Sequence, residues 1–111
     1  MATKKSVSII IPNYNGRQLL KEYLPYALEA IKNAGTVFEI IIVDDCSTDD
    51  SVATIRTEFP WAKLILNPHN RGFSHACNQG IEAAQYELIF LLNSDVKLTP
   101  DYFEHQWKHF S

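Results

Sequence analysis

The sequence is poor in glycine and has no long apolar run, and each scarcity excludes a class of protein. Its four glycines cannot form the Gly-rich loops GxGxxG or GxxxxGKS/T, which excludes the usual dinucleotide and P-loop phosphate sites. The longest apolar runs hold about five residues, whereas a membrane-spanning helix needs roughly twenty. No apolar segment follows the charged N-terminus, as it would in a signal peptide. We therefore expect no direct membrane segment.

Cysteine and positive charge are also scarce. Cys46 and Cys77 lie far apart and form no CxxC pair, so we expect reduced thiols and a cytoplasmic chain. Ten basic residues against thirteen acidic ones give a net charge of −3, which argues against nucleic acid as a partner. The chain has 111 residues, of which 46% are hydrophobic and 21% are charged. This composition predicts one globular domain over residues 1–111.

Short β-branched runs alternate with apolar stripes of helical spacing. The runs predict strands over residues 7–11, 38–43, 62–66 and 88–92. Stripes over residues 19–31, 52–59, 74–84 and 100–110 predict one helix after each strand. Strands that are apolar on both faces and alternate with helices require cover on both sides. The pattern therefore predicts a parallel sheet in a three-layer α/β/α fold.

Proline and glycine mark the expected ends and interruptions of these elements. Pro12 should end the first strand, and Pro25 should kink the first helix or divide it in two. Gly35 should close that helix as a C-terminal cap. Thr99 is expected to cap the last helix, with Pro100 at its first position.

Two apolar helix faces carry further expectations. The packed face of the third helix should consist of Ala76, Cys77, Gly80, Ile81 and Ala84. The last helix still shows Trp107 and Phe110 at its end, and such rings need something to bury against. We therefore expect the natural domain to continue beyond Ser111, so that this chain is an N-terminal part of a longer one.

Polar clusters follow all four predicted strands, at the edge where ligands bind in open parallel sheets. They are residues 12–16, 44–50, 67–72 and 93–95. Asp95, directly after the fourth strand, suits a hard cation such as Mg²⁺ or Mn²⁺; the alternative is a turn aspartate that bonds nearby N–H groups. Asp44 and Asp45 are adjacent, so their side chains should point to opposite faces. One would then bind a ligand while the other holds the loop, unless both only cap the following turn and helix.

Aromatic and basic residues complete these clusters. Tyr14 would stack under a planar base, or else is a half-buried core tyrosine. Arg71, next to Gly72, would approach a phosphate or a base, or else is a solvated loop arginine. His105 and His109 are spaced like a metal pair, but no third ligand accompanies them, and surface histidines are the better interpretation.

Four ordered segments resemble the family 2 glycosyltransferases of the GT-A fold, over Val7 to about Phe103. They read VSIIIPNYNG, EIIIVDDCSTDDS, NRGFSHACNQGI and IFLLNSDVKLTPDYF. The third and fourth are most similar to bacterial transferases that add rhamnose or related sugars to cell-surface polysaccharides. The resemblance implies a Rossmann-like nucleotide-sugar-binding half, which transfers a sugar from a UDP- or dTDP-sugar to a glycan or glycolipid acceptor with inversion.

The resemblance also implies roles for individual residues. Asp45 would hydrogen-bond the base, Asp44 would support its loop or share the contact, and Asp95 would ligate the metal. Asn93 stands where the family has the first acid of its DXD motif, which weakens the case for a divalent cation. The remaining nucleotide-sugar contacts would come from Pro12, Tyr14, Arg71, Gly72, Asn78, Asn93 and Ser94.

Nothing after Asp95 matches the family's general base, so the catalytic residue is unknown from this chain. The main alternative is a binding module that holds a nucleotide sugar without turnover. Peripheral association with the inner membrane face, through a partner or a further region, is an additional expectation. A receiver-like signalling domain fits less well, because its acid pair would follow the first strand rather than the second.

Overall fold

The computed structural model describes residues 5–110, with side chains for residues 5–106. Strands and helices alternate along the described residues, as the sequence predicts. The strands are β1 (Val7–Asn13), β2 (Phe38–Asp44), β3 (Lys63–Leu66) and β4 (Leu88–Leu91). The helices are α1 (Arg17–Asn33), α2 (Ser51–Glu58), α3 (Phe73–Ala83) and α4 (Tyr102–Phe110).

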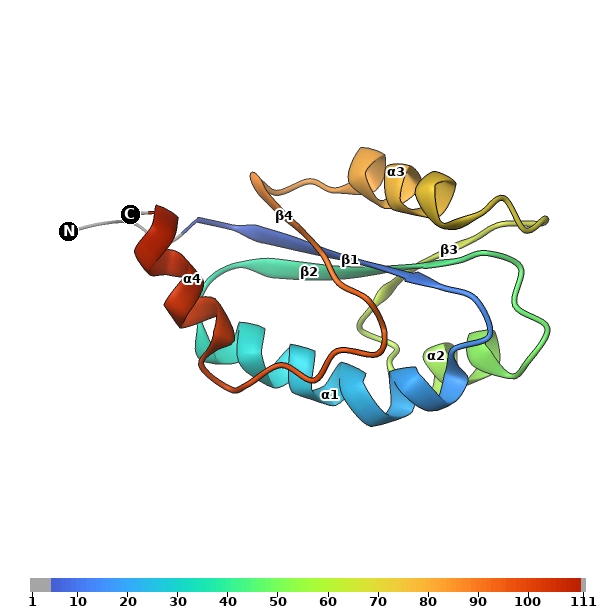
Figure 1. The fold of residues 1–111 in the computed structure, drawn as a ribbon, viewed down its shortest axis with the longest axis horizontal. Coiled ribbons are helices and arrows are strands. Elements are labelled where there is room, and N and C mark those ends of the chain that lie inside the picture. Colours follow the sequence, from blue (N-terminus) through green and yellow to red (C-terminus); the bar gives the residue numbers. More distant parts are fainter. Residues whose placement is uncertain (1–4, 111) are drawn as a thin grey trace.

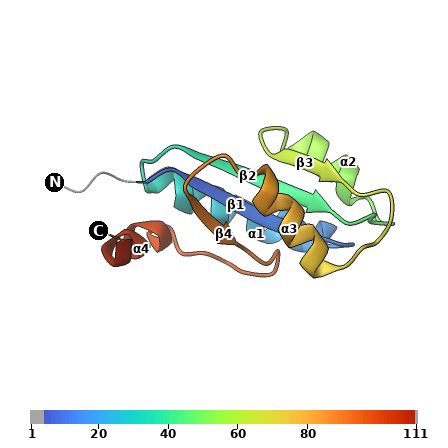
Figure 2. The same cartoon turned by 90° about the horizontal axis from the view of Figure 1, so that it is seen from above.

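The four strands form one sheet in the order β3-β2-β1-β4, and every pairing is parallel. Figure 1 shows α3 on one face of this sheet and α1 and α2 on the other, and Figure 2 shows α3 lying across the strands. The predicted three-layer α/β/α arrangement with a Rossmann-like sheet is confirmed.

Alternating side chains of the central strands build one core on each face of the sheet. Ile9 and Ile11 of β1 point into the larger core, which also contains Leu24 of α1 and Phe103 of α4. The intervening residue Ile10 points into the smaller core beneath α3. Because both faces of β1 and β2 are buried, these strands read as continuous apolar runs.

Helix α1 is a single helix, so the expected division at Pro25 is wrong. Pro25 cannot donate to the carbonyl of Lys21, but both residues are exposed, and water can bond that carbonyl instead. At the other end the prediction is confirmed. Gly35 follows the helix with φ +65° and donates its N–H to the Lys32 carbonyl, which is a left-handed cap that glycine adopts easily.

Pro12 does not end the first strand, which continues to Asn13. Asn13 accepts a bond from Asp45 of the neighbouring loop, and Ile10 accepts one from Leu92, so alternate residues of β1 face β2 and β4. The missing N–H of Pro12 therefore faces the β4 side, just where that pairing ends.

The beginning of α4 and one face of α3 also differ from expectation. Helix α4 starts at Tyr102, and Pro100 lies in the turn before it, where the Tyr102 N–H bonds the Thr99 carbonyl. Ile81 is 39% exposed and does not belong to the packed face of α3, whose buried residues are Ala76, Cys77 and Gly80. The expectation for the Trp107 and Phe110 rings concerns side chains outside the described ones.

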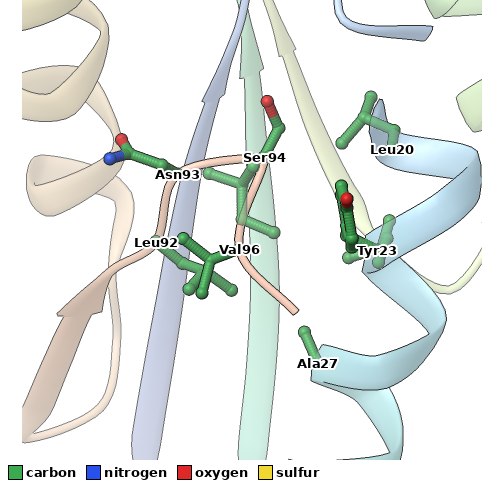
Figure 3. A pocket seen from close by; sticks show the side chains of 9 residues that line it. Leu20, Tyr23, Ala27, Leu92, Asn93, Ser94 and Val96 are labelled. Atoms are coloured by element: carbon green, nitrogen blue, oxygen red, sulfur yellow. The ribbon is translucent and has the colours of Figure 1, made fainter. Parts of the chain in front are cut away.

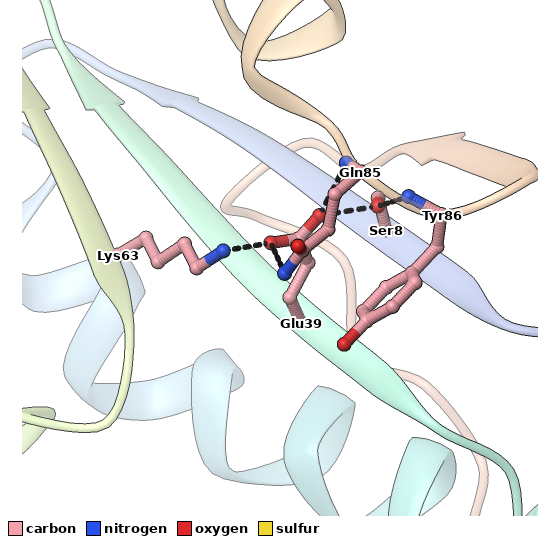
Figure 4. A network of polar contacts seen from close by, with 5 residues as sticks. All are labelled: Ser8, Glu39, Lys63, Gln85 and Tyr86. Carbon is pink, nitrogen blue, oxygen red and sulfur yellow. Dashed lines mark hydrogen bonds and ion pairs between the residues drawn. The ribbon is translucent and has the colours of Figure 1, made fainter.

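A buried carboxylate fastens the amino ends of the strands. Glu39 of β2 accepts hydrogen bonds from Ser8 of β1, from Lys63 of β3 and from the backbone and side chain of Gln85, before β4 (Figure 4). Burial by itself would raise the pKa of Glu39, but bonds from the Gln85 N–H, Lys63 and Ser8 hold this pKa below its ordinary value. One charged group therefore joins all four strands at the end opposite the polar loops.

Candidate functional site

Asp44, the last residue of β2, organises the first two polar loops. It is 2% exposed and accepts hydrogen bonds from Asn13 Nδ2 at 2.9 Å, Ser47 N at 2.9 Å and Ser47 Oγ at 2.6 Å. Asn15 also joins the loop after β1 to the loop after β2, because its Oδ1 accepts the Thr48 N–H at 2.7 Å. Asp44 thus supports the loop, which is one of the two roles expected for it.

Asp45, the next residue, binds the third polar loop, residues 67–72. Its carboxylate accepts the Arg71 N–H at 2.9 Å, the Gly72 N–H at 2.8 Å and Asn67 Nδ2 at 3.0 Å, and it is 4% exposed. Burial alone would raise the pKa of Asp45, but these three donors and the nearby His75 charge hold the pKa below its ordinary value. Asp45 is therefore ionised at neutral pH.

The two aspartates serve different loops, as the prediction of opposite faces requires. Asp44 bonds Asn13 at the end of β1 and Ser47 in the loop after β2, whereas Asp45 bonds the loop after β3. Cys46, the next residue, has a φ of +64°, an uncommon conformation for a residue other than glycine. Its thiol donates to the Pro68 carbonyl at 3.4 Å, so the strained position is held by the third loop.

A cavity of about 200 Å³ opens where the loops after β1 and β3 meet. It contains four of the predicted site residues, namely Pro12, Tyr14, Asp45 and Gly72. Tyr14 is 51% exposed, so it is not a core tyrosine, and its ring is available to a ligand. The same cavity is also lined by Asn13, Asn70, Phe73 and Ala76. Ala76 was expected only on the packed face of the third helix, and the other three were not among the predicted site residues.

The turn after β4 lies at the same edge of the sheet but outside this cavity. Asn93 and Ser94 border a separate space of about 10 Å³ against α1, which is roughly the size of one water. In Figure 3 the Ser94 hydroxyl points toward the Leu20 end of α1, and the Asn93 amide points away from the helix. Asp95 is exposed and follows on the same turn.

Two predicted residues lie apart from the cavity lining. The Arg71 side chain is exposed, and only its backbone N–H has a described role, as a donor to Asp45. Asn78 is exposed in the middle of α3. Among residues 5–110, no three or more His, Cys, Asp or Glu side chains gather as a metal site would require. Likewise, no helix within that range is long and apolar enough to cross a membrane.

The missed residues are amides and apolar groups rather than charged ones. Asn13 bonds Asp44, and Asn67 forms a reciprocal amide pair with Gln79 at 2.6 and 2.7 Å. An amide in a turn has many ordinary uses, so its residue type alone gives no signal. Phe73 is 60% exposed at the start of α3. Its position directly after Arg71 and Gly72 is the sequence signal that could have placed it in the site.

Comparison with known proteins places these residues in a family. The family model described as glycosyl transferase family 2 matches residues 8–111. A relative from Pseudomonas savastanoi pv. phaseolicola, undecaprenyl-phosphate 4-deoxy-4-formamido-L-arabinose transferase, is 38% identical over 102 residues. The match covers 87% of this chain and 30% of the relative, so the chain spans about a third of the length of that relative.

Two solved structures share the fold of this chain. A structure of S. aureus TarS 1-349 has a TM-score of 0.80 at 23% identity, over 93% of this chain and 31% of that chain. A mannosyltransferase from Pyrobaculum calidifontis, in complex with GDP-Man and Mn²⁺, has a TM-score of 0.75 at 26% identity, over 89% of this chain and 30% of that one. The order of strands, the shared fold and the matched model lead to one assignment: this chain belongs to glycosyl transferase family 2 and has its GT-A fold.

Proposed function

We propose that this chain binds the nucleotide-diphosphate sugar donor of a glycosyl transfer, with a UDP- or dTDP-sugar as the ligand. The observation that carries the proposal is the cavity that gathers Tyr14, Asp45 and Gly72 from separate loops. The Tyr14 ring is exposed for stacking on a planar base. Gly72 has no side chain, and nothing lies within 4 Å of the point where a Cβ would stand, so a ligand can approach the backbone closely.

Asp45 supplies the selective contact with the base. An ionised carboxylate can accept about four hydrogen bonds, and Arg71, Gly72 and Asn67 supply the three described donors. The Arg71 N–H is shared between the two carboxylate oxygens, at 2.9 and 3.1 Å, so an N–H of the ligand can bond one oxygen while Arg71 keeps the other. Uracil and thymine carry an imide N–H, whereas a carboxylate repels a ring nitrogen that has only a lone pair. Bases that present such an N–H, uracil and thymine among them, are therefore the ligands that this contact favours.

A divalent cation would be held by Asp95, with the Asn93 amide oxygen as a second hard ligand. One carboxylate suffices where the diphosphate and water provide the remaining oxygens, as is usual for Mg²⁺. When bound, such a cation neutralises the charge that develops on the diphosphate leaving group. The mannosyltransferase with GDP-Man and Mn²⁺ supports this assignment. Asp95 is exposed, so the cation can reach it without any rearrangement of the core.

For the whole protein we propose transfer of the sugar to a glycan or glycolipid acceptor, with inversion by direct displacement, in cell-surface polysaccharide synthesis. The relatives named as undecaprenyl-phosphate sugar transferases support a lipid-linked acceptor, and with it work at the inner face of a membrane. This chain would then be the donor-binding part, 1–111, and the base that deprotonates the acceptor would belong to another part of the protein.

Titration calorimetry with UDP and dTDP, each with and without Mn²⁺, tests the donor site. We expect binding that Mn²⁺ strengthens, and loss of about tenfold or more in Tyr14→Ala, because base–aromatic stacking contributes about 1–3 kcal/mol. Trp61→Ala is the matched control, since Trp61 is 42% exposed at the amino end of β3. A folded sample that binds neither nucleotide would refute the proposal.

Asp95→Ala separates the metal from the base. The variant should keep its affinity for UDP without metal and lose the strengthening by Mn²⁺, because the base contacts lie in the other loops. Unchanged strengthening would remove Asp95 from the site. If donor analogues bind normally but the whole protein transfers no sugar, the binding module is the better interpretation.

A further inference from the structure

The side-chain oxygen of Asn13 is a buried acceptor that no donor in residues 5–106 satisfies. Asn13 is 2% exposed, and its amide nitrogen donates to Asp44 Oδ1 at 2.9 Å and to Ser47 Oγ at 3.3 Å. A flipped amide would turn its oxygen toward the Asp44 carboxylate, oxygen against oxygen. The orientation is therefore fixed, and Asn13 Oδ1 must point away from Asp44.

Gly16 leaves the space that this oxygen occupies. A Cβ on Gly16 would stand 2.5 Å from Asn13 Oδ1 and 3.4 Å from the hydroxyl oxygen of Ser94. Both oxygens thus lie beside the same point. The Ser94 hydroxyl has no hydrogen-bond partner among the described residues, and it is the side-chain donor that borders this point. Buried acceptors in proteins are normally satisfied, so an empty acceptor next to an unused donor indicates a bond made in another state.

We propose that Ser94 is a positioning residue, whose hydroxyl donates to Asn13 Oδ1 when the donor nucleotide and its cation bind. This inference rests on the proposed function. The turn that carries Ser94 also carries Asn93 and Asp95, the oxygens assigned to the cation. When these oxygens and the diphosphate share one cation, the turn moves toward the loops after β1 and β2, and the new bond holds it there.

The bond would connect two parts of the site that the structure leaves separate. On one side, Asn13 belongs to the network of Asp44 and Ser47, which shapes the loops beside the base cavity. On the other side, Ser94 directly precedes Asp95 in the chain, so a bond that holds Ser94 also holds Asp95. Binding at the base cavity and binding of the cation would then favour each other, as two ligands do when they select the same arrangement.

Isothermal titration with UDP and Mg²⁺ tests the coupling in Ser94→Ala and Ser94→Thr. We expect Ser94→Ala to weaken UDP–Mg²⁺ binding about three- to tenfold, the range of one neutral hydrogen bond. Ser94→Thr keeps a hydroxyl and should restore most of the affinity. Uridine has no diphosphate to draw the turn inward, so its affinity should be equal in all three proteins. Thr57→Ala, which removes an exposed hydroxyl on α2, is the control.

Urea unfolding of the ligand-free proteins separates positioning from a merely structural role. Because the bond is absent in the ligand-free structure, Ser94→Ala should leave the free energy of unfolding unchanged. In NMR spectra, the side-chain amide signals of Asn13 should shift on addition of UDP–Mg²⁺ in the wild type and much less in Ser94→Ala.

Each failure has its own signature. Equal UDP–Mg²⁺ affinities in the wild type and Ser94→Ala overturn the positioning role but leave nucleotide binding in place. Equal weakening for uridine and UDP–Mg²⁺, or loss of ligand-free stability, also overturns it, because the hydroxyl would then act in the resting fold. A folded wild type that binds no nucleotide overturns the proposed function and the positioning role together.

Discussion

Replacement of Asp45 separates its structural contacts from its charge. Asp45→Ala removes the acceptor of three donors, Arg71 N, Gly72 N and Asn67 Nδ2. Bonds to a charged acceptor contribute about 1.5–3 kcal/mol each, and water reaches part of the freed groups. We therefore expect Asp45→Ala to lower the free energy of unfolding by about 3–5 kcal/mol, a large share of the roughly 5–15 kcal/mol of a typical domain.

Asp45→Asn should cost far less, because the neighbouring amides can adjust. Asn67 and Gln79 exchange two hydrogen bonds, so both amides can flip together, keep their pair and present an oxygen to the amide nitrogen of the replacement side chain. The oxygen of that side chain then accepts the Gly72 N–H. What remains is the loss of charge assistance and a poorer contact with Arg71, about 1 kcal/mol.

Urea unfolding, followed by tryptophan fluorescence, measures both variants at pH 7 and again in acid. The folded-state pKa of Asp45 is lowered, so its contribution is present above the unfolded pKa and is lost as pH falls through the folded one. The difference between the wild type and Asp45→Asn should therefore shrink in acid. The reasoning is refuted if Asp45→Ala and Asp45→Asn are equally destabilised, since the three donors would then not depend on an acceptor here.

Three other changes probe the fold that carries the site. Gly80→Ala would put a Cβ 2.2 Å from Ile10 Cγ2 in the closed core under α3. Urea unfolding should show that the free energy of unfolding falls by about 1–3 kcal/mol. An increase, as alanine gives at an exposed helix position, would contradict the close packing. In Gly72→Ala the added Cβ meets no neighbour, but the residue must adopt φ +96° and ψ 165°. Thermal unfolding should show that the free energy of unfolding falls by about 1–3 kcal/mol. Unchanged stability would mean that the loop adopts another conformation. Glu39→Gln should make the free energy of unfolding depend less on pH in acid. The pKa of Glu39 is lowered in the folded state, so this group contributes stability above its unfolded pKa, and the contribution is lost as pH falls through the folded pKa. A pH dependence as steep as that of the wild type would assign the acid sensitivity to other groups.

The parallel direction of the strands and their alternation with helices could be predicted because β1 and β2 are buried on both faces. Such strands need apolar residues at every position, and the runs around Ile10 and Ile41 have that composition. The cap at Gly35 could also be predicted, because its φ of +65° depends on the local chain. The division of α1 at Pro25 was wrongly allowed because the effect of a proline depends on its exposure, which periodicity does not report.

The clustering at the carboxyl edge could be predicted from topology, but the partners of each side chain could not. Asp45 accepts from residues 26 and 27 positions further along the chain, and the next residue, Cys46, has a left-handed backbone. No local pattern predicts a cysteine in that conformation. The nucleotide roles of Tyr14, Asp45 and Asp95 stay predictions that the binding experiments test.

The Glu39 network has a consequence for the versatility of this architecture. All four strands are anchored to one carboxylate at the end remote from the candidate cavity. Their alignment therefore does not rely on the connecting segments at the opposite rim. A segment such as 67–72 should tolerate exchange with that of another transferase when the replacement keeps the three donors to Asp45, so that new donor preferences could be introduced while the sheet stays intact.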